Sequence, residues 1–414
     1  MKASTAAQTG PVRAALDTAL AALDTPTPAP PGQPWAATSL AWGTIGSALA
    51  HIENARTTNE PAEQDDRWAK AHEWVQAATA HGVEATDVTA LYLGVPAVTF
   101  TLDAAGRYRA SQARLLEQTV AVAHRRVDAA TARLRSGAAA TFAEYDVFYG
   151  LTGLGALLLR TAPGDDALGR ILQHLVALTR PRTVQGRSVP GWWVSHDPRR
   201  GASPHFPAGH ANLGMAHGMG GILALLAAAH RAGATVPGHD DALHLLLGHL
   251  DTWVQDGPAG PWWPETLTLH DVAAGRPHHG GPARPSWCYG TPGLARAGQL
   301  AALALGDRPR QEFFEHALDR CLSDPVQLAR INDAGLCHGW AGLYQSTWRA
   351  AADATSPALA AHLPRLRAAL AANANPGTED PGFLDGTAGT ALALMTALTD
   401  TAPATGWDTC LLIA

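Results

Sequence analysis

A short signature of two small residues three positions apart recurs seven times and constrains the fold more than any other feature of the chain. Each copy reads Gly-x-x-Gly or a close variant and opens an apolar run that favours a helix. The spacing runs from 47 residues between Gly339 and Gly386 to 72 between Gly218 and Gly290, which leaves room for two helices and a loop. The first glycines of the copies are Gly43, Gly94, Gly150, Gly218, Gly290, Gly339 and Gly386, and the second copy has Ala97 in place of its second glycine.

Two kinds of helical segment are expected in each repeat. Six stretches between the glycines are amphipathic and predict outer helices: 67–80, 112–134, 167–179, 242–254, 311–322 and 359–371. Runs such as 154–159, 222–229 and 390–398 are apolar nearly all round and predict buried inner helices. The Gly- and Pro-rich stretch 257–285 is interpreted as a long loop, because the repeat resumes directly after it. We therefore expect an all-α fold, a closed (α/α)7 toroid in which residues 1–414 form a single domain.

Composition and charge narrow the class of protein. The 414 residues are 46% hydrophobic and 16% charged, an ordinary globular balance, and the net charge is −6 without a basic run, which gives little support to a nucleic-acid role. The first residues do not resemble a secretory signal, and the longest apolar runs are far shorter than the roughly 20 residues of a membrane span. We expect a soluble, cytoplasmic protein in which the four cysteines form no disulfide scaffold.

If the seven glycines are equivalent, the residues just before them form one ring of side chains at one end of the fold. Cys288 and Cys337 stand two positions before their glycines in neighbouring repeats, and His338 follows Cys337. Two thiolates and one imidazole are a three-ligand zinc set that leaves a fourth position open. Because two thiolates balance the charge of Zn²⁺, such a site suits activation of a further thiol better than polarisation of a carbonyl. The sequence therefore predicts zinc bound by Cys288, Cys337 and His338.

Other interpretations of these residues stay open. Cys288 alone would more often be a buried apolar cysteine, but Cys337 and His338 at the same repeat position favour a metal. His217 belongs to the same ring and is a candidate for proton transfer, although it could be a core histidine. Asp146 could orient His217, transfer a proton itself or cap a helix. Cys321 and Cys410 lie off the ring and are interpreted as core or surface residues, and His278 and His279 as loop residues. The tryptophan pairs 192–193 and 262–263 could line a peptide groove, but packing is the favoured interpretation.

The local motifs resemble those of the lanthionine synthetase C-like cyclases over essentially the whole chain. The matching segments are Tyr145-Asp146 with Tyr149-Gly150-Leu-Thr-Gly153, Asn212-Leu-Gly-Met-Ala-His217-Gly218, Arg284-Pro-Ser-Trp-Cys288-Tyr289-Gly290, Leu336-Cys337-His338-Gly339, Asp385-Gly386-Thr-Ala-Gly389 and Trp407. The Trp-Cys-Tyr-Gly and Cys-His-Gly segments are the specific part of this resemblance, because the glycine repeats alone would be weak support.

The resemblance implies a zinc-dependent enzyme that adds peptide cysteine thiols to dehydroalanine or dehydrobutyrine and so forms thioether rings. It places His217, Asp146, Arg284 and Tyr289 around the reacting centre, with His217 as the proton donor. Arg284 is expected either to stabilise an enolate or to anchor a loop by an ion pair, and Tyr289 could be only a wall residue. The expected partners are a dehydrated precursor peptide and a separate dehydratase, since no dehydratase region fits before the first repeat.

Three rival functions are compatible with parts of the pattern. A relative of the same family could add a small thiol such as glutathione to dehydrated peptides. A non-catalytic scaffold could bind a leader peptide, although it would not need an open zinc position. A zinc prenyltransferase also uses a helical toroid and metal-bound thiolates, but its ligand set usually includes a carboxylate.

Overall fold

Helices dominate the structure, a computed structural model that describes residues 2–58, 60–374 and 380–414. The inner helices predicted from the repeats are present, and each has the first glycine of its repeat as the residue that precedes its first turn. They are α2 (Thr44–Thr57), α4 (Val95–Ala105), α7 (Leu151–Thr161), α9 (Met219–Arg231), α12 (Thr291–Leu305), α15 (Trp340–Asp353) and α17 (Thr387–Thr399).

Close backbone approach explains the second glycine of the signature. In six repeats, a Cβ atom added to this glycine would lie 1.8–2.6 Å from the carbonyl oxygen of the residue six positions earlier, too close for any side chain. The chain therefore turns back over the first turn of each inner helix. Repeat two, which has Ala97 at this position, differs: its first glycine, Gly94, has a φ of 72°, a conformation that glycine adopts without strain.

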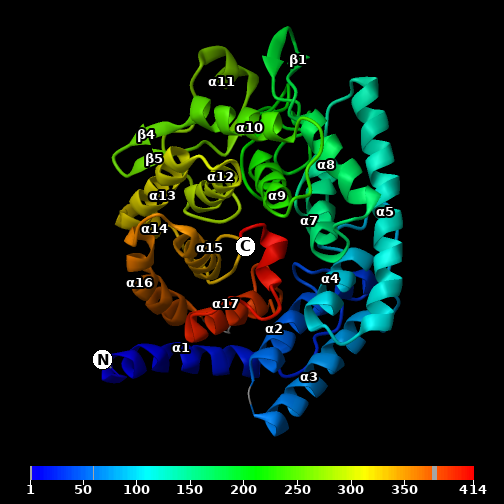
Figure 1. The fold of residues 1–414 in the computed structure, drawn as a ribbon, viewed down its shortest axis with the longest axis vertical. Helices are drawn as coiled ribbons and strands as arrows, with labels where there is room; N and C mark the ends of the chain where they lie inside the picture. The colour runs from blue at the N-terminus through cyan, green and yellow to red at the C-terminus, as the bar shows by residue number, and fades with distance from the viewer. Residues whose placement is uncertain (1, 59, 375–379) are drawn as a thin grey trace.

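The inner helices form a closed ring (Figure 1). In chain order each packs on the next, from α2 through α4, α7, α9, α12 and α15 to α17, and α17 packs on α2. Around them lie the outer helices, which match the six amphipathic stretches predicted above to within one residue at their C-terminal ends or contain them: α3 (Pro61–Thr79), α5 (Arg109–Ser136), α8 (Asp166–Leu178), α10 (His239–Trp253), α13 (Arg308–Ser323) and α16 (Ala358–Asn373). Each inner helix packs against the outer helix that follows it, except α17, which packs against α1 (Lys2–Ala22). The first helix of the chain thus completes the last repeat.

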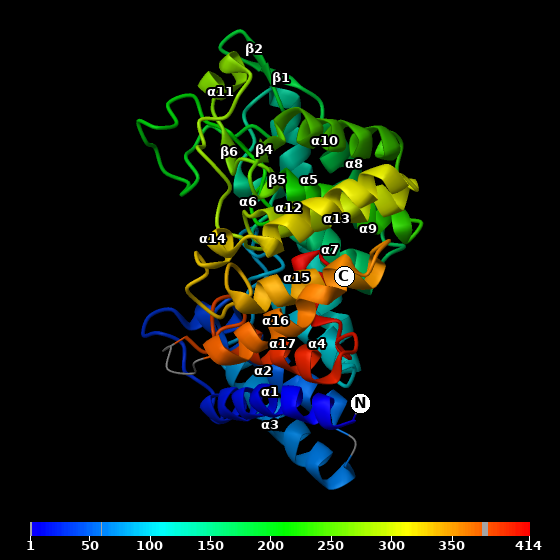
Figure 2. The ribbon, with the colours of Figure 1, turned by 90° about the vertical axis from the view of Figure 1, so that its left-hand side faces the viewer.

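Strands are few and short in the described chain. Three antiparallel pairs are formed by β1 (Arg182–Val184) with β2 (Arg187–Val189), β3 (Ala211–Asn212) with β6 (Thr266–Leu267), and β4 (Gln255–Gly257) with β5 (Gly260–Trp262). The remaining short elements are α6 (Phe142–Tyr145), α11 (Leu269–Ala274), α14 (Pro325–Leu328), and the 3-10 helices η1 (Pro34–Thr38) and η2 (Trp407–Leu411). Long connecting segments project from one side of the ring, the side on which α14 lies (Figure 2).

The stretch 257–285, interpreted from the sequence as a long loop, contains short regular elements. This segment contains β5, β6 and α11, and it is organised by side chains that the Gly and Pro content conceals. Thr268 and Asp271 form a reciprocal capping box at the start of α11. Trp262 and Trp263, which precede the capping box in the same segment, are buried and anchor the segment to the core.

Most side chains that the sequence assigns to packing are buried. Both tryptophan pairs, 192–193 and 262–263, are at most 7% exposed, and Cys321 and Cys410 are 1% exposed. Among the described residues, no helix has both the length and the apolar character that crossing a membrane requires.

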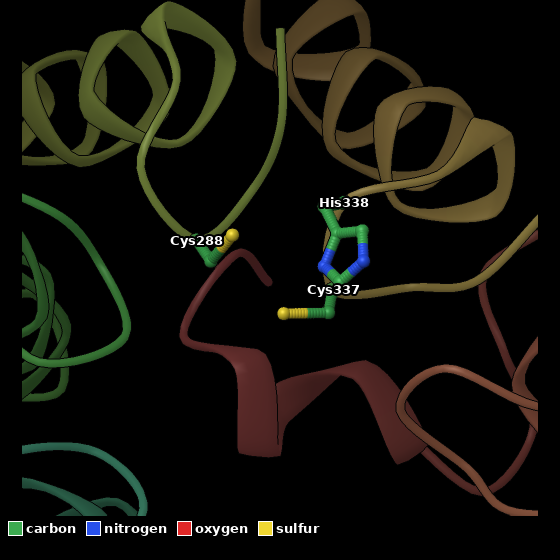
Figure 3. A group of neighbouring side chains, drawn as sticks. All are labelled: Cys288, Cys337 and His338. Carbon is green, nitrogen blue, oxygen red and sulfur yellow. The ribbon is translucent and has the colours of Figure 1, made fainter. Parts of the chain in front are cut away.

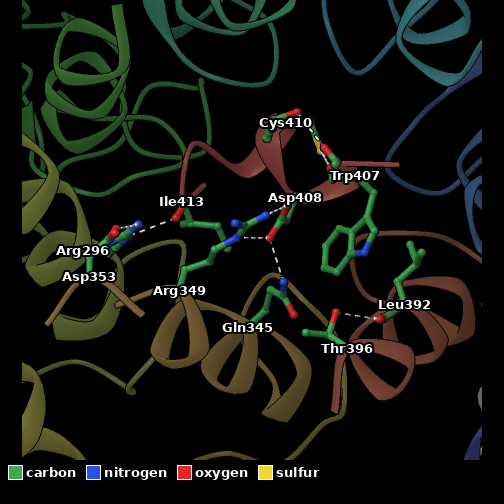
Figure 4. A network of polar contacts seen from close by, with 12 residues as sticks. Arg296, Gln345, Arg349, Asp353, Leu392, Thr396, Trp407, Asp408, Cys410 and Ile413 are labelled. Atoms are coloured by element: carbon green, nitrogen blue, oxygen red, sulfur yellow. Dashed lines mark hydrogen bonds and ion pairs between the residues drawn. The ribbon is translucent and has the colours of Figure 1, made fainter. Parts of the chain in front are cut away.

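The segment that includes η2 runs through the middle of the ring (Figure 1). Its Asp408 is fully buried and accepts two hydrogen bonds from the guanidinium of Arg349 on α15, at 2.7 and 2.8 Å. Arg296 on α12, 1% exposed, donates from Nε to the carbonyl oxygen of Ile413 at 2.9 Å. These charge-assisted contacts connect separate inner helices to one central segment (Figure 4).

Candidate metal centre

Backbone hydrogen bonds connect equivalent positions of neighbouring repeats, two residues before each first glycine. The N–H of Ala216 donates to the carbonyl oxygen of Cys288 at 3.3 Å, and the N–H of Cys288 donates to that of Cys337 at 3.2 Å. Cys337 continues the series to Leu384 at 3.0 Å, and Leu384 to Ala41 at 2.7 Å. The two cysteines are neighbours because they occupy the same position in adjacent repeats of the ring.

A cluster of two thiols and one imidazole lies at this level of the ring (Figure 3). One ligand atom from each of Cys288, Cys337 and His338 lies within 4.8 Å of the other two. Cys288 is buried, whereas Cys337 and His338 are partly exposed, so the cluster is accessible from one side. In the part of the chain that the structure describes, this is the one group of at least three His, Cys, Asp or Glu ligands with such spacing. The donor atoms fit a tetrahedral metal that keeps an open position.

Charge is distributed unevenly within the cluster. Contact with Cys337 and with His338 lowers the pKa of Cys288 well below its ordinary value, although burial opposes the shift. The neighbouring Cys288 raises the pKa of Cys337. Contact with Cys288, together with the carboxylates of Asp385 and Asp333, raises the pKa of His338. A metal ion needs deprotonated sulfurs and a neutral imidazole, so the lowered pKa of Cys288 favours a bound cation, whereas the proton held by His338 would have to leave.

Two carboxylates flank His338. Oδ2 of Asp333 lies 3.6 Å from Nε2, and Oδ1 of Asp385 lies 3.6 Å from Nδ1. Arg284 belongs to this group as well, since its Nη1 donates to Oδ1 of Asn332 at 3.1 Å and lies 3.6 Å from Asp333. Arg284 was expected either to stabilise an enolate or to anchor a loop by an ion pair. The contacts with Asn332 and Asp333 are of the kind that the second role requires.

The His217 imidazole contacts a buried carboxylate. Its Nδ1 lies 2.6 Å from Oδ2 of Asp146, whose side chain is fully buried, whereas His217 is 22% exposed. The other oxygen of Asp146 accepts the backbone N–H of Tyr149 at 2.5 Å, so the carboxylate is fixed from both sides. Asp146 is not the N-cap residue of α7, a position that Gly150 occupies. Nε2 of His217 lies outside this contact, and no hydrogen bond joins it to another described residue.

Tyr289 is close to His217 and adjoins one of the cysteines in the chain. It follows Cys288 in the chain, and its ring centroid is 6.3 Å from that of His217. Nδ2 of Asn212 donates to its hydroxyl at 3.4 Å, and burial raises the pKa of the phenol above its ordinary value. Burial also raises the pKa of Glu265, and the negative charge of Cys288 adds to the effect. Glu265 was not among the predicted site residues, and no local motif marks it.

Sequence reasoning also missed Asp333, although a local signal for it exists. In three repeats an Asn or Asp stands six residues before the first glycine, and its side chain accepts the N–H of a glycine two residues later. These turns are Asn212 with Gly214, Asp333 with Gly335, and Asp380 with Gly382. The shared Asx turn shapes the approach to each inner helix.

The fold is a ring of paired helices, and a Cys2His candidate metal site lies at one end of it. These two features together define the class of protein to which the chain belongs. The chain belongs to the lanthionine synthetase C-like family, because the model of that family matches residues 34–412.

Two similar proteins carry related names. Over 208 residues, 49% of this chain and 48% of the relative, the chain is 24% identical to the nisin biosynthesis protein NisC of Lactococcus lactis subsp. lactis. The match thus spans about half the length of that protein. A solved structure named nisin cyclase superposes with a TM-score of 0.76 at 20% identity, and the match covers 92% of this chain and 93% of that one. This likeness establishes a shared fold.

Proposed function

We propose that this protein is a zinc-dependent cyclase that adds cysteine thiolates of a ribosomally made peptide to dehydroalanine or dehydrobutyrine, forming lanthionine and methyllanthionine rings. The observation that carries the proposal is the cluster of Cys288, Cys337 and His338 beside the His217–Asp146 pair. Family membership and the names of the two similar proteins agree with it.

The donor set fits zinc. Two sulfurs and an imidazole nitrogen within 4.8 Å of one another match zinc ligation with one position left for substrate. A zinc ion held there would supply the positive charge that keeps a substrate cysteine in its thiolate form near neutral pH.

His217 is proposed to move the proton of the reaction. With Nδ1–H directed to Asp146, Nε2 can accept the proton of the substrate thiol. The thiolate sulfur then bonds to the β-carbon, the electrons of the double bond shift toward the carbonyl as an enolate, and the proton returns from Nε2 to the α-carbon. Atoms and charge balance, because the thiol hydrogen ends on the α-carbon of the thioether product. Tyr289, held neutral and close to His217, would form one wall of this site.

The remaining expectations of the sequence agree with this function. We infer that the closed ring of inner helices and its surrounding helices form an (α/α)7 double toroid with a single domain. The partners would be a dehydrated precursor peptide and a separate dehydratase acting before this protein, in the cytoplasm.

Elemental mass spectrometry and a cyclisation assay test the proposal together. The purified protein is expected to hold about one zinc per chain, as a single site of this kind binds one ion, and a Cys337→Ala variant is expected to lose it. A dehydrated peptide with a free cysteine should lose its reactivity toward a thiol-alkylating reagent in the presence of the wild-type protein and keep it with Cys337→Ala.

The same assay separates the rival functions. An intermolecular adduct when glutathione is supplied, without a ring, would identify a small-thiol transferase. Metal-free protein that remains folded and binds the peptide without converting it would identify a scaffold. Either result would overturn the proposed cyclisation.

A further inference from the structure

Four side chains are layered on the His217 side of the site. The ring of His217 is stacked on Phe142, with centroids 5.2 Å apart and planes at 14°, and on Tyr149, at 6.1 Å and 6°. The guanidinium of Arg200 covers the ring of Tyr149, with Cζ 4.2 Å from the ring centroid, and its Nη2 donates to the Tyr149 hydroxyl at 3.2 Å. An exposed arginine thus stands two layers from the proposed proton-transfer residue.

A tight turn holds Arg200 in this place. Oδ1 of Asp197 accepts the N–H groups of Arg199 and Gly201 at 2.9 and 2.8 Å, and the N–H of Arg200 donates to the carbonyl oxygen of Asp197 at 2.9 Å. Arg200 has a φ of 66°, in the left-handed region that residues with a side chain rarely adopt. Backbone strain of this kind persists where the surrounding structure requires it and is frequent at functional sites.

The charge of Arg200 is not matched within the protein. It forms no ion pair with a carboxylate in residues 2–58, 60–374 or 380–414, and its partner is the neutral phenol of Tyr149. Arg284, in contrast, is bound to Asn332 and lies beside Asp333. The guanidinium of Arg200 is therefore held over the Tyr149 ring, two layers from His217, and is free to take an anionic ligand.

Two carboxylates lie on the His338 side of the centre. Asp333 and Asp385 flank His338, and both also line a cavity of about 260 Å³. Asp333 also lies 3.6 Å from Arg284, whereas Asp385 has no arginine partner among the described residues, so a carboxylate of a bound peptide would be favoured near Arg200 over this side. The two sides thus differ in their charged side chains, and a peptide whose charges are unevenly placed along its length would bind in one preferred orientation.

We infer that Arg200 is a substrate-binding residue whose guanidinium pairs with a carboxylate of the peptide that reaches the His217 side of the site. The inference rests on the proposed function, because it assumes that a peptide is the substrate. It adds a specificity determinant: acidic residues near the reacting dehydro residue favour binding. A planar guanidinium forms two parallel hydrogen bonds to a carboxylate, and the Tyr149 ring below it fixes the orientation.

Binding of two synthetic peptides, measured by fluorescence anisotropy, tests the inference. Each fluorescein-labelled peptide contains one dehydroalanine and has serine in place of cysteine, so that no ring can form during the titration. One peptide has a glutamate three residues to either side of the dehydroalanine, and the other has glutamine at both positions. Arg200→Gln should weaken binding of the glutamate peptide by about fivefold, the range of a partly exposed ion pair, and leave binding of the glutamine peptide unchanged.

Arg199→Gln is the matched control. It removes the same charge from the same turn, and Arg199 makes no side-chain contact with Tyr149 in the described structure, so its effect on either peptide should stay below about twofold. Equal effects of the two substitutions, or equal effects of Arg200→Gln on both peptides, would overturn the inference. Arg200→Lys should recover part of the preference for glutamate, which loss of folding could not explain.

Failure of the inference and failure of the proposed function give different results. Wild-type protein that binds both peptides equally contradicts the inference even if it closes rings in a cysteine-containing peptide. Wild-type protein that prefers the glutamate peptide but closes no ring contradicts the cyclase proposal and leaves the role of Arg200 supported. Absence of binding to either peptide would count against both.

Discussion

At the scale of single residues, the candidate chemistry depends on how neighbouring groups orient two histidines. His217 is fixed by one buried carboxylate, Asp146, whereas His338 lies between two partly exposed ones. A buried carboxylate accepting an N–H selects the tautomer of an imidazole and stabilises its protonated form. The buried pair is therefore suited to proton transfer, and the exposed arrangement to holding a ligand in place.

Asp146→Asn should reduce turnover strongly without loss of metal. The amide cannot accept the Nδ1–H of His217 with the same charge, so we expect kcat for ring formation to fall by about 10²–10⁴-fold. The measurement is single-turnover cyclisation followed by mass spectrometry, with zinc content determined on the same sample. A variant with unchanged zinc and a kcat close to that of the wild type would show that Asp146 does not assist His217.

At the scale of elements, the junction of the first helices contains a buried titratable side chain. His51 on α2 contacts two neighbouring elements: its Nε2 lies 2.9 Å from the carbonyl oxygen of Leu23, after α1, and its ring stacks on Trp74 of α3 with centroids 5.3 Å apart. Burial lowers the pKa of His51 to about 4. A neutral imidazole is thus part of the junction between the first helices of the chain.

This histidine should make the protein less stable in mild acid. Unfolded His51 takes up a proton near pH 6.5 and folded His51 only near pH 4, so the unfolded state binds more protons between these values. The free energy of unfolding should therefore fall as the pH decreases from about 6.5 to about 4, by about 3 kcal/mol from this group.

Urea unfolding of wild-type protein and of His51→Gln between pH 7.5 and pH 4 measures this contribution. The variant lacks the titrating group, so its stability should decrease less steeply over the same range. Other buried histidines titrate in both proteins and cancel in the difference. Parallel pH profiles would show that His51 is not the source.

Gly342, in the first turn of α15, packs closely against the backbone next to the metal cluster. A Cβ atom at this residue would lie 1.8 Å from the carbonyl oxygen of Leu336, which directly precedes Cys337. Gly342→Ala should therefore displace Cys337, destabilise the fold by about 1–3 kcal/mol as overpacking does, and lower the zinc content of the folded protein. Thermal unfolding and elemental analysis of the same preparation measure the two effects.

Gly248→Ala on α10 is the matched control for this substitution. No atom lies within 4 Å of the position where its Cβ would be, and the residue is within a helix. This variant should gain about 0.5–1 kcal/mol of stability from helix propensity and keep its zinc. If the two glycine variants change stability and zinc content equally, the close approach of the backbone at Gly342 is not the reason for glycine at this repeat position.

At the scale of the whole molecule, the ring is closed by contacts between its first and last helices and is connected through its centre. α1 and α2 both pack on α17, and the central segment is bound by arginines on α12 and α15. Trp287, next to Cys288, also donates from Nε1 to the carbonyl oxygen of Leu411 at 2.9 Å. The metal cluster therefore depends on the central segment as well as on its own two repeats.

Asp408→Asn tests the central contact. Asp408 is fully buried and pairs with both Nε and Nη2 of Arg349, so the variant leaves a partly buried guanidinium without its counter-charge. We expect a loss of about 3–5 kcal/mol in urea unfolding. Replacing both partners, as Asp408→Leu with Arg349→Met, should destabilise less than the single change. A loss below about 1 kcal/mol for Asp408→Asn, the level of a surface ion pair, would show that the contact is not structural.

Much of the ring and of the cluster could be predicted from the sequence because the repeat position is encoded locally. A glycine that excludes a side chain marks each helix start, and the residues two positions earlier become neighbours through backbone hydrogen bonds, which places Cys288 beside Cys337. The same positional argument predicts the inner helices and most of the outer ones. It fails for the segment 257–285, where a capping box and buried tryptophans create structure without any repeat signal.

The helical array and the two-thiol, one-imidazole group follow from local sequence, because glycine spacing and side-chain identity act over a few residues. The completion of the last repeat by α1, the contacts of Arg284 with Asn332 and Asp333, and the position of Arg200 over Tyr149 depend instead on the folded chain. These contacts join segments that are far apart in the chain, and their relative positions depend on the paths of loops of unequal length. Local spacing carries no information about those paths, which are set by packing over the entire ring.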